Sequence, residues 1–136
     1  MKKILIITFI LITIVYLFSS CSKISKDPID LAKQLDEVDY IVSIIVDDEE
    51  IEDAADNFEI RSNSIEYIVT AIPDDYDDEK AGIFVYCDNK AHAERIEEDL
   101  KDFLDENEDD ITRGVVERYG KIVFIGCEDV LEDCKK

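Results

Sequence analysis

His92 is the single histidine in this 136-residue chain, and it is the only imidazole that acid–base or metal chemistry could use. It lies in a stretch with a helical pattern, beside Ala91, Ala93 and Glu94. One histidine excludes sites built from several histidines, and no serine stands in a G-x-S-x-G setting. The sequence also lacks the glycine-rich phosphate loops and the H-E-x-x-H zinc motif. We therefore predict a surface histidine, no catalytic residue and no cofactor.

A partial calcium motif follows residue 104. Asp105, Asn107 and Asp109 match positions 1, 3 and 5 of an EF-hand loop. Position 6, normally the glycine of the turn, is Asp110, and position 12, normally a bidentate glutamate, is Val116. Because the two most demanding positions fail, we predict no metal site. Asp105, Asn107 and Asp109 are kept only as weak calcium candidates.

The chain has four cysteines, at positions 21, 87, 127 and 134. Cys21 ends an apolar stretch considered below, and three remaining thiols allow at most one disulfide within the chain. No C-x-x-C pattern suggests a redox or zinc site. Cys87 and Cys127 each follow a predicted strand, so they could be bridged if those strands are neighbours. Two buried, reduced thiols are the alternative, and a Cys127–Cys134 bridge is less favoured because a helix intervenes.

These residues must be positioned by helices and strands that alternate along the chain. Capping residues, apolar spacing and β-branched runs mark each one. In chain order we predict a helix over 27–38, a strand over 40–46, a helix over 47–58, strands over 64–72 and 81–87, a long helix from 88 or 89 to about 105, a strand or short helix around 115–119, a strand over 121–126 and a short helix over 128–134.

The fold class that this order predicts is α+β. We expect a small, mostly antiparallel sheet of about four strands, with helices packed on one face so that their apolar stripes are buried. Residues 83–88 and 122–128 share the order strand, cysteine, acid, helix. This echo could reflect a weak ferredoxin-like duplication.

The first twenty-one residues have the pattern of an export signal. Two lysines precede an apolar run from Ile4 to Phe18, and two serines then precede Cys21. The segment Leu17–Cys21 resembles the lipobox of bacterial lipoproteins, with Phe18 where that family more often has leucine. The resemblance implies cleavage after Ser20 and attachment of a diacylglycerol to the thiol of Cys21.

Three parts follow from this resemblance: a signal peptide over 1–20, a lipidated N-terminus and tether over 21–26, and a single acidic α+β domain over 27–136. An uncleaved membrane anchor and ordinary secretion are the alternatives. The fifteen-residue apolar run would span roughly 23 Å as a helix, against about 30 Å of hydrocarbon core. The run is therefore short for a membrane anchor.

The charge is strongly acidic. Lys and Arg number 15 and Asp and Glu number 35, for a formal net charge of −20. Without the two leader lysines, 13 basic residues stand against 35 acidic ones, a formal charge of −22. This balance disfavours nucleic acid and anionic lipid headgroups, and it favours solubility and cationic partners.

The acidic body behind a lipobox resembles small lipoproteins of unknown function from Gram-positive bacteria. We predict a protein of the cell membrane, on its extracytoplasmic face, held there by lipid on Cys21. Its expected role is that of a non-enzymatic binding or accessory domain, with an envelope protein or a cationic ligand as partner and no nucleic acid. The alternatives are an anchored hydrolase, for which the abundance of acids prevents naming a carboxylate pair, and a weak calcium-responsive module.

Overall fold

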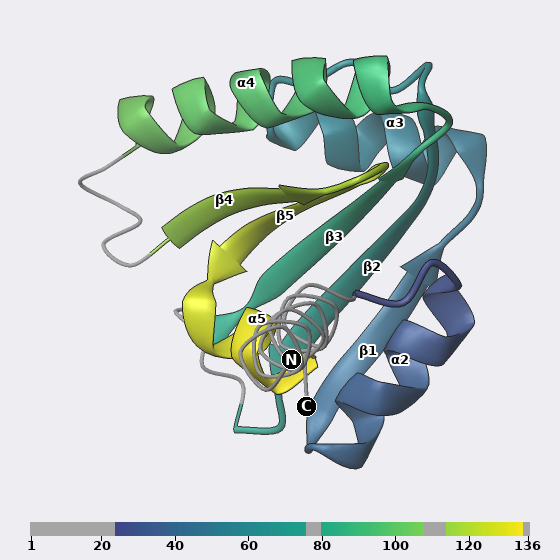
Figure 1. Ribbon diagram of the computed structural model, residues 1–136, viewed down its shortest axis with the longest axis vertical. Coiled ribbons are helices and arrows are strands. Elements are labelled where there is room, and N and C mark those ends of the chain that lie inside the picture. Colours follow the sequence, from purple (N-terminus) through teal and green to yellow (C-terminus); the bar gives the residue numbers. More distant parts are fainter. Residues whose placement is uncertain (1–23, 76–79, 108–113, 135–136) are drawn as a thin grey trace, which may run out of the picture.

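The helices and strands form where the sequence pattern predicts them, within one or two residues at each end (Figure 1). The computed structural model describes residues 24–75, 80–107 and 114–134. The elements are α2 (Pro28–Glu37), β1 (Tyr40–Ile45), α3 (Asp48–Asn57), β2 (Ile65–Pro73), β3 (Gly82–Cys87), α4 (Lys90–Glu106), β4 (Gly114–Tyr119), β5 (Ile122–Cys127) and α5 (Glu128–Cys134).

Side-chain caps fix the start of three helices. The carboxylate of Asp27 accepts a hydrogen bond from the backbone N–H of Ile29 at 2.9 Å, and Pro28 follows it at the first helical position. Asp47 and Asn89 cap α3 and α4 in the same way. These caps satisfy donors that would otherwise lack a partner at each helix start. The three helices therefore begin within two residues of the predicted starts at 27, 47 and 88 or 89.

Five strands form one antiparallel sheet in the order β1-β2-β3-β5-β4. The predicted antiparallel α+β class is confirmed, with one strand more than the expected four or so. The additional edge strand is β4, for which the sequence left a strand and a short helix open. It pairs with β5 through a two-residue turn at Gly120 and Lys121.

Helices cover both faces of the sheet, which corrects the expectation of one covered face (Figure 1). Phe84 and Tyr86 of β3 join a core cluster with α2 and α5, here called the α2 face. Val85 and Cys87 of the same strand join a second cluster with α3 and α4, here called the α4 face. A strand buried on both sides is a continuous apolar run, as residues 82–87 are.

Strand β5 passes directly into α5 without a loop. Gly126 has φ +147°, and a Cβ built on it would lie 2.5 Å from the backbone oxygen of Ala81. The next residue, Cys127, donates its N–H to that same oxygen at 2.9 Å. Only glycine allows the two backbones to approach this closely, so Gly126 sets the position of α5.

Candidate functional site

Two pockets lie at opposite ends of the central strands. One pocket, here called the basic pocket, is lined by several lysines and lies at the end of the sheet that holds Tyr67 and Cys87. The other, here called the acidic cleft, is lined mainly by acids and lies at the opposite end, at Pro73. Strand β2 runs from the basic pocket to the acidic cleft, and β3 returns to the basic pocket.

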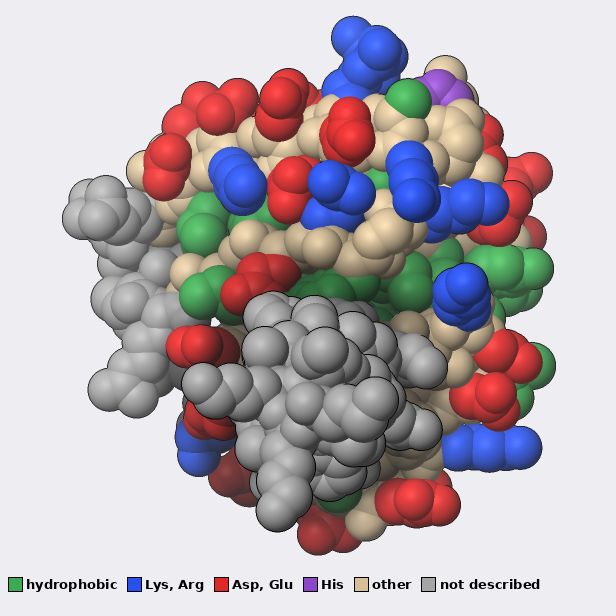
Figure 2. Space-filling view, in the orientation of Figure 1, with side chains coloured by type: hydrophobic (Ala, Val, Ile, Leu, Met, Phe, Trp, Pro, Cys, Tyr) green, Lys and Arg blue, Asp and Glu red, His purple; other side chains and the backbone are tan. Residues whose placement is uncertain are grey.

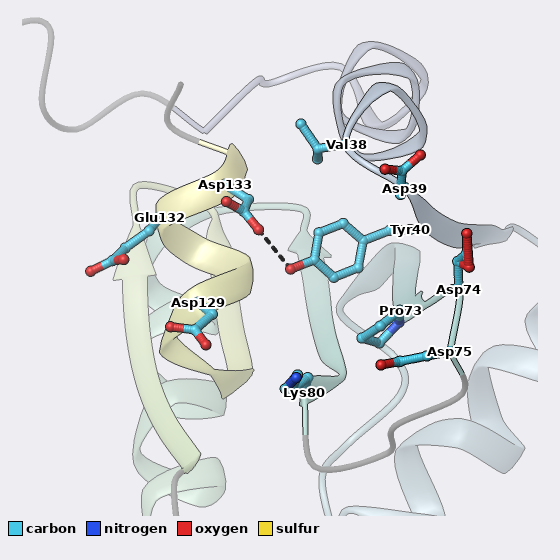
Figure 3. A pocket seen from close by; sticks show the side chains of 10 residues that line it. All are labelled: Val38, Asp39, Tyr40, Pro73, Asp74, Asp75, Lys80, Asp129, Glu132 and Asp133. Carbon is cyan, nitrogen blue, oxygen red and sulfur yellow. Dashed lines mark hydrogen bonds between the residues drawn. The ribbon is translucent and has the colours of Figure 1, made fainter.

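The acidic cleft separates α5 from the ends of β1 and β2 and has a volume of about 550 Å³ (Figure 3). Six carboxylates and one lysine are among its lining residues: Val38, Asp39, Tyr40, Pro73, Asp74, Asp75, Lys80, Asp129, Glu132 and Asp133. The acids come from both walls, because three belong to α5 and three to the strand ends. This arrangement favours cations near the cleft.

Tyr40 occupies the middle of the acidic cleft and bridges its two walls (Figure 3). Its hydroxyl donates a hydrogen bond to Oδ2 of Asp133 at 2.8 Å. Burial, followed by the hydrogen bond to Asp133 and its negative charge, raises the pKa of the Tyr40 phenol well above its usual range. The phenol therefore stays protonated and acts as a donor. Across the described residues, no group of three or more His, Cys, Asp or Glu side chains is arranged to hold a metal.

The basic pocket has a volume of about 660 Å³ and lies where the chain enters the fold at Ile24. Four cations and one acid line it, together with tyrosines and isoleucines: Ile24, Lys26, Glu66, Tyr67, Tyr86, Cys87, Lys90, Arg118, Tyr119, Gly120, Lys121 and Ile122. Figure 2 shows Lys and Arg side chains gathered beside hydrophobic ones on the face drawn. This local excess of positive charge opposes the net charge of −20 of the whole chain.

A bulge in β2 turns Tyr67 toward the basic pocket. Ile65 pairs with Cys87 and Tyr67 pairs with Tyr86, so two residues advance on β2 for one on β3. Tyr67 therefore lies on the same side as Tyr86, with ring centroids 6.5 Å apart in an edge-to-face arrangement. Ile65 belongs to the cluster of the α4 face, so the bulge moves Tyr67 off the face that strict alternation from Ile65 would give it.

The cations of the basic pocket differ in their partners. The guanidinium of Arg118 lies 3.6 Å from Glu97 and 3.9 Å from Glu94, both on α4. Its Nε is buried and makes no hydrogen bond within the described part of the chain, because its distance of 3.6 Å to Glu97 exceeds hydrogen-bond length. Within residues 24–75, 80–107 and 114–134, the amines of Lys26, Lys90 and Lys121 form no ion pair with a carboxylate.

Of the two alternatives left open for Cys87 and Cys127, the structure has the buried, reduced thiols. Cys87, Cys127 and Cys134 are buried, free thiols. Strands β3 and β5 are neighbours, as the bridge required, but they are antiparallel, so their C-terminal ends lie at opposite ends of the sheet. Six residues of strand separate the levels of Cys87 and Cys127, roughly 20 Å. Cys21 lies outside the described residues, among which no helix is long and apolar enough to cross a membrane.

His92 lies at the surface in the first turn of α4, as expected. Its Nδ1 is 2.6 Å from Oδ1 of Asp88, a carboxylate that can only accept, so Nδ1 carries the proton in this contact. This hydrogen bond lowers the pKa of Asp88. His92 and Ser64 line a small hollow of about 50 Å³, but the imidazole donates to Asp88, and the backbone N–H of His92 donates to Oδ1 of Asn89. The contacts of His92 are therefore those of a residue in the first turn of a helix.

Two of the three calcium candidates lie at the end of α4. Asp105 lies inside α4, and Asn107 caps the end of that helix. Asp109 lies outside the described residues. An EF-hand loop leads into a second helix, whereas the described chain resumes as a strand at Gly114. Weak calcium binding by these residues stays a prediction, and a calcium-dependent shift of the melting temperature would test it.

The basic pocket was missed by reasoning from the sequence. Its lysines come from the entering segment, the start of α4 and the β4–β5 turn, which are far apart in the chain. The one local signal is the Gly120-Lys121 turn, in which Gly120 has φ +63° and places a lysine at a hairpin tip.

No protein-family model, no curated protein and no solved structure matches this chain.

Proposed function

We propose that this protein is a lipid-anchored binding or accessory domain, held on the extracytoplasmic face of a cell membrane through Cys21. The leader pattern supports the anchor, since an apolar run and two serines precede that cysteine. The described residues start three positions later at Ile24, whose side chain is only 5% exposed. A domain that begins this close to the anchor is held near the membrane surface.

The observation that carries a binding role is the basic pocket. Its volume of about 660 Å³ falls in the range of roughly 300–1,000 Å³ that small-molecule sites occupy. Apolar and aromatic side chains with a few charged groups line it, which is the usual composition of such sites. A binding domain therefore fits the geometry better than a purely structural one.

Mass spectrometry of the full chain tests the anchor. Expressed in a bacterium that processes lipoproteins, the chain should lose residues 1–20 and gain a diacylglycerol on Cys21. The Cys21→Ser variant should keep its leader, and globomycin should leave the same larger precursor. Cys134→Ser, which alters a cysteine of the folded domain, should be processed like the unaltered chain. An unmodified Cys21 in the mature chain would contradict the proposal.

An anchored hydrolase is the second candidate, because the acidic cleft has carboxylates on facing walls. Asp74 and Asp75 lie on one side of Tyr40, and Asp129 lies on the other (Figure 3). Two facing carboxyl groups could act as acid and base in hydrolysis. A panel of glycoside and ester substrates should then be cleaved, and Asp129→Asn should abolish cleavage while Asp102→Asn, on the exposed side of α4, does not. No cleavage, or equal loss in both variants, would exclude this candidate.

The ferredoxin-like relationship also stays a proposal. Strand β3 leads through Cys87 and Asp88 to α4, and β5 leads through Cys127 and Glu128 to α5, which supports an internal duplication. The two helices cover opposite faces of the sheet, which is unlike two copies of one unit.

A further inference from the structure

Three lysines line the basic pocket and have no carboxylate ion-pair partner among the described residues. The chain has 35 acidic residues, yet Lys26, Lys90 and Lys121 form no ion pair among the described residues. The only acid in the described lining is Glu66. The first turn of α4, which begins at Lys90, contains no acid, so the positive end of its dipole adds to the field. The pocket is therefore suited to an anion.

The wall of the basic pocket is apolar and held in place. Tyr67 and Tyr86 form an edge-to-face pair, and Ile122 belongs to the core cluster of the α2 face. The hydroxyl of Tyr86 donates to the carbonyl oxygen of Ser25 at 2.8 Å, which fixes the entering segment against the wall. Tyr67 remains 37% exposed, so an apolar ligand could cover it. The ligand should thus join an anionic group to an apolar body.

We propose that the basic pocket binds a phosphate group carried on an apolar body. Three lysine amines are separate point charges, and a phosphate offers several oxygens to receive them. A carboxylate is matched best by the two parallel donors of an arginine, but Glu94 and Glu97 already hold the guanidinium of Arg118. This inference rests on the proposed binding function and specifies its ligand.

Two sources could supply such a ligand: a phospholipid of the membrane or a soluble phosphate ester. Ile24, which lines the pocket, is three residues from Cys21. Three extended residues reach at most about 11 Å, so a lipid on Cys21 would hold the pocket near the headgroups. The shared chemistry is the phosphate with its apolar part, and the experiment below separates the sources.

Calorimetric titration of the full chain in dodecyl maltoside micelles, which contain no phosphate, tests this site, with empty micelles as reference. The probes are hexyl phosphate, inorganic phosphate and hexanol. Hexyl phosphate should saturate at one per chain and bind more tightly than either other probe. Lys121→Gln and Lys90→Gln should each raise its Kd about tenfold, as loss of a charge-assisted hydrogen bond does. Lys33→Gln, an exposed lysine of α2 outside the pocket, should leave the Kd unchanged.

Three outcomes would overturn the inference: no saturable binding of hexyl phosphate, equal affinity for inorganic phosphate, or an effect of Lys33→Gln as large as that of Lys121→Gln. Melting curves of the variants guard against misfolding. Micelles that also contain phosphatidylglycerol identify the source, because weaker apparent binding of hexyl phosphate there supports a lipid headgroup and unchanged binding supports a soluble ester. If Cys21 is lipidated while hexyl phosphate fails to bind, the ligand class is wrong and the anchor stands.

Discussion

The thiol of Cys87 should be almost inert in the folded protein, although it lies in the lining of the basic pocket. Its side chain is 3% exposed, and burial is the main cause that raises its pKa from 9.0 to about 12. Nearby carboxylates of Asp88 and Glu66 act in the same direction. Because the thiolate is the nucleophile, this shift suppresses alkylation.

The size of the effect follows from the thiolate fraction. At pH 8, a thiol with a pKa of 9.0 is roughly one-tenth ionised, and a thiol with a pKa of about 12 is ionised about once in ten thousand molecules. Alkylation of Cys87 in the folded chain should therefore be about a thousandfold slower than in the unfolded chain. Protection by burial would slow it further.

Iodoacetamide at pH 8, followed by peptide mass mapping over time, measures this rate with and without denaturant. Cys87, Cys127 and Cys134 should be unmodified in the folded chain and fully modified once it unfolds, without added reductant. Reaction of Cys87 at the unfolded rate would refute the burial argument. A missing label on both Cys87 and Cys127 until reductant is added would show the disulfide that the structure does not contain.

The same pKa shift predicts a change of stability with pH. Between pH 9 and about 12 the folded chain keeps the proton of Cys87 and the unfolded chain loses it. Folding therefore binds more protons in this window, and the free energy of unfolding should fall as pH rises through it. The contribution is fully present below pH 9. A Cys87→Ala variant should show a smaller fall over this window in denaturant titrations.

Two pairs of substitutions and one binding assay test other features of the structure. In thermal unfolding, Gly126→Ala should lower the free energy of unfolding by about 2–3 kcal/mol or more, because residue 126 has φ +147° and its new Cβ would lie 2.5 Å from a backbone oxygen. Gly120→Ala should lower it by only about 1 kcal/mol, because residue 120 has φ +63° but its Cβ would enter open space. Tyr40→Phe should lower the free energy of unfolding by about 1 kcal/mol, because it removes the hydrogen bond to Asp133. Tyr67→Phe should lower it less, because that ring is partly exposed. Equal losses in the two variants would contradict the importance of the Tyr40 hydrogen bond. The acidic charge predicts no retention of DNA at moderate salt, and a gel shift there would contradict it.

The sequence predicted the elements well and their layering poorly. Caps such as Asp27 and Asp47 are local signals, so the helix starts followed from neighbouring residues alone. The covering of both sheet faces depends on tertiary packing. Its signal was present in the unbroken apolar runs at residues 83–87 and 122–125, which a strand with one solvated face would not show. The register shift between Ile65 and Tyr67 had no recognisable sequence signal.

Neither pocket could be assembled from the sequence. The acidic cleft joins the ends of β1 and β2 to α5, and these parts meet only because β5 runs beside β3 and turns into α5. The basic pocket similarly gathers Lys26, Lys90 and Lys121 from distant parts of the chain. The sequence also left open whether Cys87 and Cys127 are bridged, because neither the adjacency nor the relative direction of their strands could be derived from it.

Burial of both sheet faces changes what enforces correct strand alignment during folding. In a sheet with one solvent-exposed face, a register slip by one residue moves the apolar side chains into water and is therefore unfavourable. In β3 and β5 the same slip would move each apolar side chain from one buried face of the sheet to the other, so the hydrophobic effect discriminates little between the two registers. The correct register must then be selected by the packing of side-chain shapes. The rings of Phe84 and Phe124 pack with centroids 4.9 Å apart, and a methyl group added at Gly82 would clash with Phe124.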